Sequence, residues 1–423
     1  MTPGQCFHGG VNMDGAIYEF SYNGNTHLYV KKNHSIYRSF QPKNNDLAEH
    51  AEPPSGVAIS SIWLNVTNIC NLNCRYCFTP PLKRKKSQSK SQQMTKEIAQ
   101  KAIIMLANIW KGHSDNRPAT IVFFGGEPLV NYDVVEHAVY FANEWSQISK
   151  IPFSYAISTN GTLLKQQFID FFSRERIAVQ LSLDGPKTNH DHNRKFHSGS
   201  GSYDSIIDGV QRLFNTIPPE SVNIRCTIAK GTASISELVR FFMGSGFKRL
   251  ELKFMSDNNR CDVGLKDSEM EMLAEDVDLA ADTIVEAMRC GLYIRPFRDH
   301  LNSLKHKRYQ SFVCGAGRSA LSVDPQGWIY PCHRFHDISD YRISHVTKPF
   351  DDSISQKFSR LKCMDIEPCN SCWAVKFCWG CCPAESMAFS KPLGYPHQKW
   401  CRMKQLEAKI SLKAATAAGY VED

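Results

Sequence analysis

The chain has 423 residues, 42% hydrophobic and 22% charged, which is typical of a folded globular protein and excludes disorder as its main state. No apolar run approaches the roughly 18 residues that a membrane span needs, and the N-terminus has no basic segment leading into an apolar core. We therefore expect a cytoplasmic protein without membrane contact. Fifty Lys and Arg against 42 Asp and Glu give a net charge of +8, too slight and too dispersed to indicate nucleic-acid binding.

Residues 1–56 carry short aromatic and β-branched runs around Asn23-Gly24, a dipeptide that favours a type I′ hairpin turn. We expect a small N-terminal β appendage here, ending in a linker over 51–56. An exposed strand edge can add a peptide strand, so the appendage is also a candidate for holding a peptide.

Residues 57–307 alternate between strand and helix patterns. The sequence predicts six strands, near 58–66, 120–124, 152–158, 178–183, 222–228 and 250–254. A helical pattern follows each of them, at 95–110, 132–147, 163–174, 204–215, 233–243 and 267–290. Six βα units predict an α/β fold with a parallel sheet and right-handed crossovers, either left open or curled into a partial (β/α)6 barrel of the TIM type.

Residues 308–423 have a different composition, in which Cys, Gly, Pro and Trp dominate before a helical tail at 401–418. Little in 310–405 indicates a hydrophobic core, so we expect this segment to need bound metal to fold.

Sixteen cysteines in a chain without a secretory route indicate metal ligands rather than disulfides. Three lie together after the first barrel strand and nine fall between Cys314 and Cys401. The other four are expected to be buried small apolar residues: Cys6, Cys226, Cys261 and Cys290.

The first cluster, Cys70, Cys74 and Cys77, has CxxxCxxC spacing directly after the first barrel strand. Three soft ligands so close in sequence can bind three corners of an iron–sulfur cubane, which leaves the fourth iron open to another ligand. A zinc site completed by a remote His is the alternative.

Glycine-containing polar segments follow the next three predicted strands: Gly125-Gly126-Glu127-Pro128, Ser158-Thr159-Asn160-Gly161 and Ser182-Leu183-Asp184-Gly185. Each of them alone could be a turn. Because the carboxyl ends of parallel strands meet at one edge of a sheet or barrel, we expect these segments to lie around a single site with the cysteines.

Together these segments resemble the radical S-adenosylmethionine (SAM) superfamily over residues 58–255, through CNLNCRYCF, FFGGEPL, STNGTLL and SLDGPKTNHDHNR. The resemblance implies a [4Fe–4S] cluster on Cys70, Cys74 and Cys77, whose open iron binds the amino and carboxylate groups of SAM. One electron would then cleave SAM, and the resulting 5′-deoxyadenosyl radical would abstract hydrogen from a substrate carbon.

The same resemblance implies the residues that contact SAM. Gly125, Gly126 and Glu127 would meet the methionine amino group, and Tyr76 would lie by the adenine. The ribose or carboxylate would be bound by Ser158, Asn160, Ser182 and Arg194. Arg194 could equally be a solvated charge, and Asp184 could contact SAM or brace its own turn, as Asp before Gly commonly does.

The second cysteine region resembles the SPASM extension of radical SAM enzymes over residues 310–405, which implies two auxiliary [4Fe–4S] clusters and three in all. From spacing alone, two zinc sites or one zinc with a disulfide also remain possible. By the resemblance the outer cluster is bound by Cys369, Cys372, Cys378 and Cys401, and the inner one by Cys314, Cys332 and Cys382. Its fourth ligand could be Cys363, Cys381 or the substrate.

SPASM-bearing enzymes act mostly on peptides and proteins, so the resemblance implies a polypeptide substrate. One alternative is a maturase that forms a cross-link or an epimer in a ribosomally synthesised precursor peptide. The other is an anaerobic sulfatase-maturating enzyme, a branch in which an Asp follows the inner-cluster Cys. Here Cys332 is followed by His333, and PCHRF resembles the cyclophane-forming maturases. His333 could be the catalytic proton acceptor of this chain, since an imidazole titrates near neutrality, or it could simply hydrogen-bond the backbone near the cluster.

We expect a precursor peptide or protein as substrate and an external electron donor of the flavodoxin or ferredoxin type. The basic run from Lys83 to Lys86 could attract an acidic leader or simply be solvated. An epimerase would need a hydrogen-atom donor, for which Cys226 and Cys261 are candidates. An iron–sulfur carrier or a zinc-binding interaction protein remains the non-enzymatic alternative.

Overall fold

The structure is a computed structural model, described at residues 17–31, 34–38, 57–78, 93–110, 117–256, 263–307 and 312–421. The predicted linker over 51–56, the basic run at 83–86, and Cys6 and Cys261 lie outside these residues. No helix in the described ranges is long and apolar enough to span a membrane.

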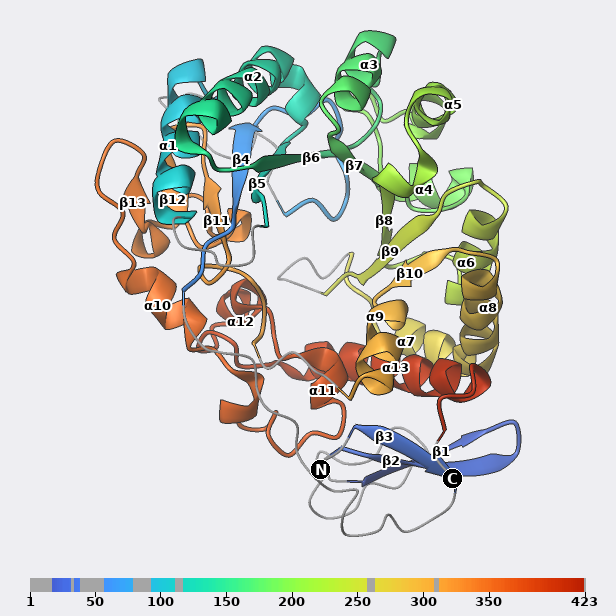
Figure 1. Cartoon of the computed structure of the whole chain (residues 1–423). Coiled ribbons are helices and arrows are strands. Elements are labelled where there is room, and N and C mark those ends of the chain that lie inside the picture. The colour runs from blue at the N-terminus through green and yellow to red at the C-terminus, as the bar shows by residue number, and fades with distance from the viewer. Residues whose placement is uncertain are drawn as a thin grey trace.

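The N-terminal segment forms a separate antiparallel sheet in the order β1 (Ile17–Tyr22), β2 (Asn25–Val30) and β3 (Ser35–Arg38). Asn23 and Gly24 both have positive φ, 47° and 75°, which confirms the type I′ turn. The ring of Tyr18 stacks on Trp373 with a centroid distance of 3.8 Å. The sheet therefore packs under the cysteine-rich region (Figure 1).

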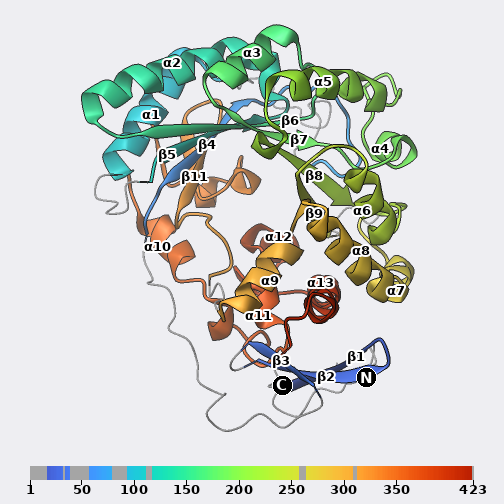
Figure 2. The same cartoon turned by 45° about the vertical axis from the view of Figure 1, so that its right-hand side comes forward.

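The predicted α/β fold with a parallel sheet is confirmed. Six strands pair in parallel and in chain order, with helices covering the outer face (Figure 2). They are β4 (Ser61–Thr67), β5 (Ala119–Gly125), β6 (Phe153–Thr159), β7 (Ala178–Ser182), β8 (Val222–Ile228) and β9 (Arg249–Phe254). Alternate residues of these strands, such as Ile224 and Leu250, are fully buried against the helices.

The helices of the barrel follow their strands as expected. They are α1 (Lys96–Trp110), α2 (Tyr132–Ser149), α3 (Gln166–Arg174), α4 (Lys187–Asn193), α5 (Tyr203–Thr216), α6 (Ile235–Met243), α7 (Asp267–Glu275) and α8 (Val277–Arg289). The prediction of a single helix over 267–290 is wrong, because this segment forms two helices that are separated at Asp276. The carboxylate of Asp276 accepts hydrogen bonds from the backbone and hydroxyl of Ser236, which tie this break to the start of α6.

The sheet has more strands than the sequence predicts. β10 (Tyr293–Arg295) pairs in parallel with β9 and leads into α9 (Phe297–Lys305). At the other edge, β11 (Ala320–Val323) pairs in parallel with β4 and continues into β12 (Trp328–Tyr330) and β13 (Ser344–His345). The cysteine-rich region thus joins the sheet of the barrel, and the two edges, β10 and β13, do not meet.

The expectation that little in residues 310–405 can form a core is wrong. Tyr330, Phe335 and Phe358 pack together in a hydrophobic cluster. The remaining helices are α10 (Ser353–Ser359), α11 (Val375–Cys378), α12 (Pro383–Ala388) and α13 (Gln398–Ala417). The long helix α13, close to the predicted 401–418, packs against α8 and α9 of the barrel.

Candidate active site

The loop that carries the first three cysteines follows β4 and is held by backbone hydrogen bonds. Asn73 N donates to Lys195 O at 2.7 Å, and Arg75 N donates to Asn193 O at 2.9 Å. Burial raises the pKa of Cys70 to about 11 and that of Cys74 to about 12. Such thiols are protonated at neutral pH, so a metal would have to displace these protons on binding.

Gly125 and Gly126 lie directly against this loop. Gly126 N donates to Thr67 O at 2.7 Å, and Glu127 N donates to Ile69 O at 2.9 Å. A Cβ on Gly126 would lie 2.2 Å from Ile69 O, and one on Gly125 would lie 2.3 Å from Thr67 O. The close backbone contact therefore requires both glycines, and through it the end of β5 positions the cysteine loop.

Replacing Gly126 by Ala is expected to displace the cysteine loop, because a Cβ cannot share space with a backbone carbonyl. We expect the iron bound after reconstitution to fall by about four per chain, the content of one cubane. The matched control is Gly244→Ala, whose Cβ would meet only Phe241 O at 3.9 Å, and which should keep its iron. Equal iron in both variants would contradict the positioning role.

Glu127 ties the ends of β5 and β6 together. Its carboxylate is fully buried and accepts hydrogen bonds from Thr159 Oγ1 at 2.7 Å and from Asn160 N at 2.7 Å. Burial raises the pKa of Glu127 to about 7. The side chain of Asn160 in turn donates to Asn71 Oδ1 at 2.9 Å and lies 3.8 Å from Cys70 Sγ. The predicted residues Glu127 and Asn160 are thus brought together beside the first cysteine.

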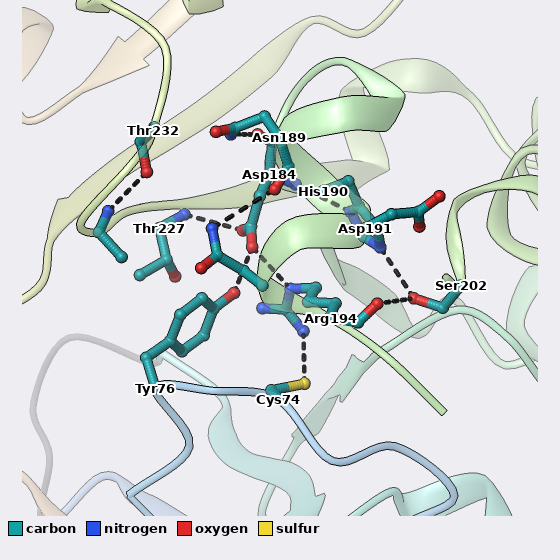
Figure 3. A network of polar contacts seen from close by, with 12 residues as sticks. Cys74, Tyr76, Asp184, Asn189, His190, Asp191, Arg194, Ser202, Thr227 and Thr232 are labelled. Carbon is teal, nitrogen blue, oxygen red and sulfur yellow. Dashed lines mark hydrogen bonds and ion pairs between the residues drawn. The ribbon is translucent and has the colours of Figure 1, made fainter. Parts of the chain in front are cut away.

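Asp184 is the centre of a buried polar network at the ends of β7 and β8 (Figure 3). Its carboxylate accepts hydrogen bonds from Tyr76 OH, from Arg194 Nε at 3.0 Å and from Thr227 N at 3.0 Å. Arg194 is therefore buried and ion-paired, not a solvated surface charge. Its Nη1 lies 3.9 Å from Cys74 Sγ, so the network connects the strand ends to the cysteine loop.

Further hydrogen bonds through His190 and Ser202 connect the backbone of Asp184 to that of Arg194. Asp184 N donates to His190 Nδ1 at 3.2 Å, so that His190 Nε2 carries the hydrogen and donates to Ser202 Oγ at 3.0 Å. The Ser202 hydroxyl then donates to Arg194 O at 3.0 Å. Burial lowers the pKa of His190 to about 4, which keeps its ring neutral in this chain of hydrogen bonds.

Ser158 and Ser182 lie on the inner face of the sheet, the face turned away from the helices. Ser158 Oγ donates to Gln180 Oε1 at 3.3 Å, and Ser182 pairs in register with Arg225 on β8. They are separate from the Asp184 network and belong to a polar row across β6 to β9.

Aromatic rings surround His333 on the same inner face. Its ring centroid lies 4.6 Å from Phe124, 5.1 Å from Trp63 and 5.2 Å from Phe78. Burial, and then the charges of His336 and Arg225, lower the pKa of His333 well below its ordinary value. The imidazole is thus neutral and faces a largely apolar wall, which weakens it as a base.

Most cysteines of the C-terminal region gather in two groups, and the binding of a cluster by either group stays a prediction. Burial, with smaller contributions from Cys382 and Cys332, raises the pKa of Cys314 to about 12, so these three thiols are neighbours. Arg334 donates to Cys382 Sγ at 3.4 Å and forms an ion pair with Glu385 at 2.5 Å. A guanidinium beside this inner group suits a site with negative charge.

The outer group gathers around Cys369. Burial, and then neighbouring thiols, raise its pKa; these neighbours are Cys378, Cys401, Cys372 and Cys363. Cys363 is thus packed with the outer group. It also lies against Gly380, where an added Cβ would be 3.0 Å from the Cβ of Cys363. Cys381 is fully buried, and its Sγ donates to Cys382 O at 3.7 Å.

No group of three or more Cys, His, Asp or Glu side chains in the described residues lies close enough to hold a single metal ion. A [4Fe–4S] cluster needs wider spacing, because each thiolate binds a different iron. Of the four scattered cysteines, Cys226 is buried as expected, but the expectation is wrong for Cys290, which is exposed.

Sequence reasoning missed the charged residues Arg225, Glu251 and Lys253, which form a linked group with Gln180 on the inner face of β7 to β9. They belong to no motif. The signal that could have found them is a polar or charged residue at every second position of otherwise apolar strands, as in VNIRCTI and RLELKF.

Comparison with known proteins relates this site to one family. Residues 64–233 match the radical SAM superfamily. A cysteine-type anaerobic sulfatase-maturating enzyme of Clostridium perfringens is 25% identical over 329 residues, which cover 74% of this chain and 85% of that protein. The radical SAM cyclopropyl synthase TigE of Paramaledivibacter caminithermalis is 30% identical over 214 residues, 46% of this chain and 43% of that protein.

Solved structures share the fold. The structure of native anSMEcpe with bound AdoMet has a TM-score of 0.68 at 21% identity and covers 85% of this chain and 99% of its own. Streptococcus suis SuiB bound to the precursor peptide SuiA has a TM-score of 0.55 at 14% identity and covers 91% and 98% of the two chains. At these identities the likeness establishes the fold.

Proposed function

The chain contains a radical SAM domain, and on this premise we propose that it is an enzyme that modifies a peptide or protein substrate. The observation that carries the proposal is the convergence of the cysteine loop, Glu127, Asn160 and Arg194 at the ends of successive parallel strands. An iron–sulfur carrier or a zinc-binding protein would need only the cysteines and not these residues at the strand ends. Relatives that mature sulfatases support a polypeptide as substrate.

The residues present fit the cofactors of this family. Cys70, Cys74 and Cys77 would hold a [4Fe–4S] cluster with SAM, which when bound supplies a carbon radical able to abstract hydrogen from the substrate. Gly125 and Gly126 position the cysteine loop by backbone contact. Tyr76, Asp184 and Arg194 hold one another beside Cys74, so that a guanidinium is available for an anionic group of SAM.

We further propose two auxiliary [4Fe–4S] clusters. Three neighbouring thiols, Cys314, Cys332 and Cys382, would bind the inner one, with Cys381 or substrate as the fourth ligand. The outer one would be bound by Cys369, Cys372, Cys378 and Cys401, with Cys363 packed beside them. In an oxidative reaction the inner cluster would take the surplus electron, and a flavodoxin- or ferredoxin-type protein would supply the first one.

For the reaction itself we propose a carbon–carbon cross-link of the cyclophane type, in which an aromatic side chain of the substrate is joined to a neighbouring residue. The wall of Trp63, Phe78 and Phe124 supports this proposal, because aromatic rings stack on such surfaces. His333, at the same wall, is neutral and would accept the proton, but as a weak base, because burial lowers its pKa. Cys226 is unsuited to donate hydrogen in an epimerase, because it is buried against the helices.

Formylglycine formation is the second candidate. It is supported by the sulfatase-maturating relatives, among them the Clostridium perfringens enzyme that is similar over most of its own length. His333 stands where that branch has an Asp. In this reaction the proton acceptor of this chain would therefore be a group other than a carboxylate at that position.

Anaerobic reconstitution with iron and sulfide, followed by incubation with SAM and dithionite, tests the proposal. We expect about twelve irons per chain, four for each cubane, and release of 5′-deoxyadenosine. Iron is measured per chain, and the nucleoside by mass spectrometry. Tightly bound zinc without 5′-deoxyadenosine would contradict the catalytic function and favour a metal-binding interaction protein.

A further inference from the structure

Strands β8 and β9 place three charged side chains on the inner face of the barrel sheet. On β8, Ile224 and Cys226 are buried against the outer helices, so Arg225 between them lies on the opposite face. On β9, Leu250 and Leu252 face the helices in the same way, and Glu251 and Lys253 lie inside. Arg225 pairs in register with Glu251, which brings the charges side by side.

Glu251 holds the two cations apart and in place. Its carboxylate lies 3.2 Å from Lys253 Nζ and 3.6 Å from Arg225 Nη1, and it accepts a hydrogen bond from Gln180 Nε2 at 3.2 Å. Only 10% of the Glu251 side chain is exposed, against 39% for Arg225 and 46% for Lys253. The group thus carries a net charge of +1, with the anion covered and both cations open.

The two cations keep hydrogen-bonding capacity to spare. The 3.6 Å separation between Arg225 Nη1 and Glu251 exceeds normal hydrogen-bond length, and a guanidinium has five N–H donors. Within the described part of the chain, Glu251 is the one carboxylate paired with either cation. Burial, assisted by the charges of Lys404 and Arg225 and opposed by those of Glu251 and Glu407, lowers the pKa of Lys253.

This group lies next to the parts of the site where chemistry is proposed. Ser182, at the end of β7, is opposite Arg225 in register, and the charge of Arg225 reaches His333 at the aromatic wall. The inner face of the sheet thus presents both the aromatic wall of Trp63, Phe78 and Phe124 and the open cations Arg225 and Lys253. Two open cations beside an apolar wall favour an anionic group of the same ligand.

We propose that Arg225 and Lys253 form a subsite that binds a carboxylate of the substrate peptide, with Glu251 as the residue that positions both cations. The subsite rests on the peptide-modifying function proposed above, because its ligand is part of the modified peptide. It assigns a preference for Asp, Glu or a free C-terminus close to the reacting residue.

The test uses the full-length reconstituted protein and two neutral-ended tripeptides, N-acetyl-Ala-Asp-Ala-amide and N-acetyl-Ala-Asn-Ala-amide. Binding is measured anaerobically by NMR titration in the presence of saturating SAM, which occupies the SAM site. We expect the Asp peptide to bind about tenfold more tightly than the Asn peptide, the size of one charge-assisted hydrogen-bonded pair. Arg225→Gln should remove most of this preference, and Arg225→Glu should reverse it.

The matched control is Arg249→Gln, which removes an exposed cation at the first residue of β9, the strand of Lys253, and should keep the preference. Lys253→Gln provides a second variant if the Arg225 variants do not fold. Equal binding of both peptides would overturn the subsite. The absence of binding by either peptide at 10 mM, which corresponds to a binding free energy of about 2.7 kcal/mol, would also overturn it. A parallel titration without SAM gives one more outcome that would overturn it. If the preference appeared only there, the two cations would be the binding site for the carboxylate of SAM. Absence of 5′-deoxyadenosine with an intact Asp preference would instead contradict the enzymatic function alone.

Discussion

Replacing Cys70, Cys74 and Cys77 together by Ala is expected to abolish the release of 5′-deoxyadenosine from SAM while about two thirds of the iron stays bound. The three thiols lie on one loop after β4, whereas the other two cysteine groups lie in the C-terminal region with a hydrophobic core of their own. Loss of the first site should therefore leave the rest of the fold in place. Iron per chain and the nucleoside, measured on the same reconstituted sample, check both parts of the prediction.

Cys290→Ala is the control for this triple variant, because Cys290 is exposed and belongs to none of the three groups. It should bind the same iron and release the same 5′-deoxyadenosine as the unchanged chain. If the triple variant still cleaved SAM, the assignment of the first cluster to these cysteines would be wrong. If it lost all of its iron, the three sites would not be independent.

Replacing Asp184 by Asn is expected to lower the free energy of unfolding by about 3–5 kcal/mol, the cost of leaving a buried partner charge unpaired. Arg194 would then lack its carboxylate, and Tyr76 and Thr227 N would lose an anionic acceptor. The same change should weaken SAM binding, since the guanidinium beside Cys74 would no longer be held. Thermal unfolding and SAM titration, both under anaerobic conditions, measure the two effects.

Two further variants separate stability from binding. The double variant Asp184→Asn with Arg194→Met removes both charges, so it should recover most of the stability but none of the SAM affinity. Asp204→Asn breaks an exposed ion pair with Lys187 and should leave both the stability and the SAM affinity nearly unchanged. If the double variant bound SAM normally, Arg194 would be structural rather than a partner of the cofactor.

Much of the barrel could be predicted because its signals are local. The alternation of strand and helix patterns along the chain indicated the six strands, and Asn23-Gly24 indicated the hairpin turn. The strands β11, β12 and β13 were missed because they have only four, three and two residues, too few to show a period. They form because β4 offers an open edge, which is a property of the assembled sheet rather than of the segment.

The site could be predicted as a set of residues but not as a set of contacts. The motifs named Glu127, Asp184 and Arg194, yet the fact that Asp184 and Arg194 pair with each other depends on how the ends of β7 and β8 meet. The clash between a Gly126 side chain and Ile69 is likewise invisible in sequence. Arg225 on β8 joins Glu251 and Lys253 on β9 only through the register of the sheet.

The pairing of β11 with β4 limits how this chain can be divided. A fragment that ended near residue 307, at the proposed boundary of the barrel, would keep every βα unit but would strip the partner from one side of β4. The backbone amides and carbonyls along that strand would then face solvent, in an apolar strand that other chains can join. Such a truncated barrel should self-associate. The cysteine-rich region therefore also protects the barrel from aggregation, because its strand β11 covers the edge of β4 within the same chain.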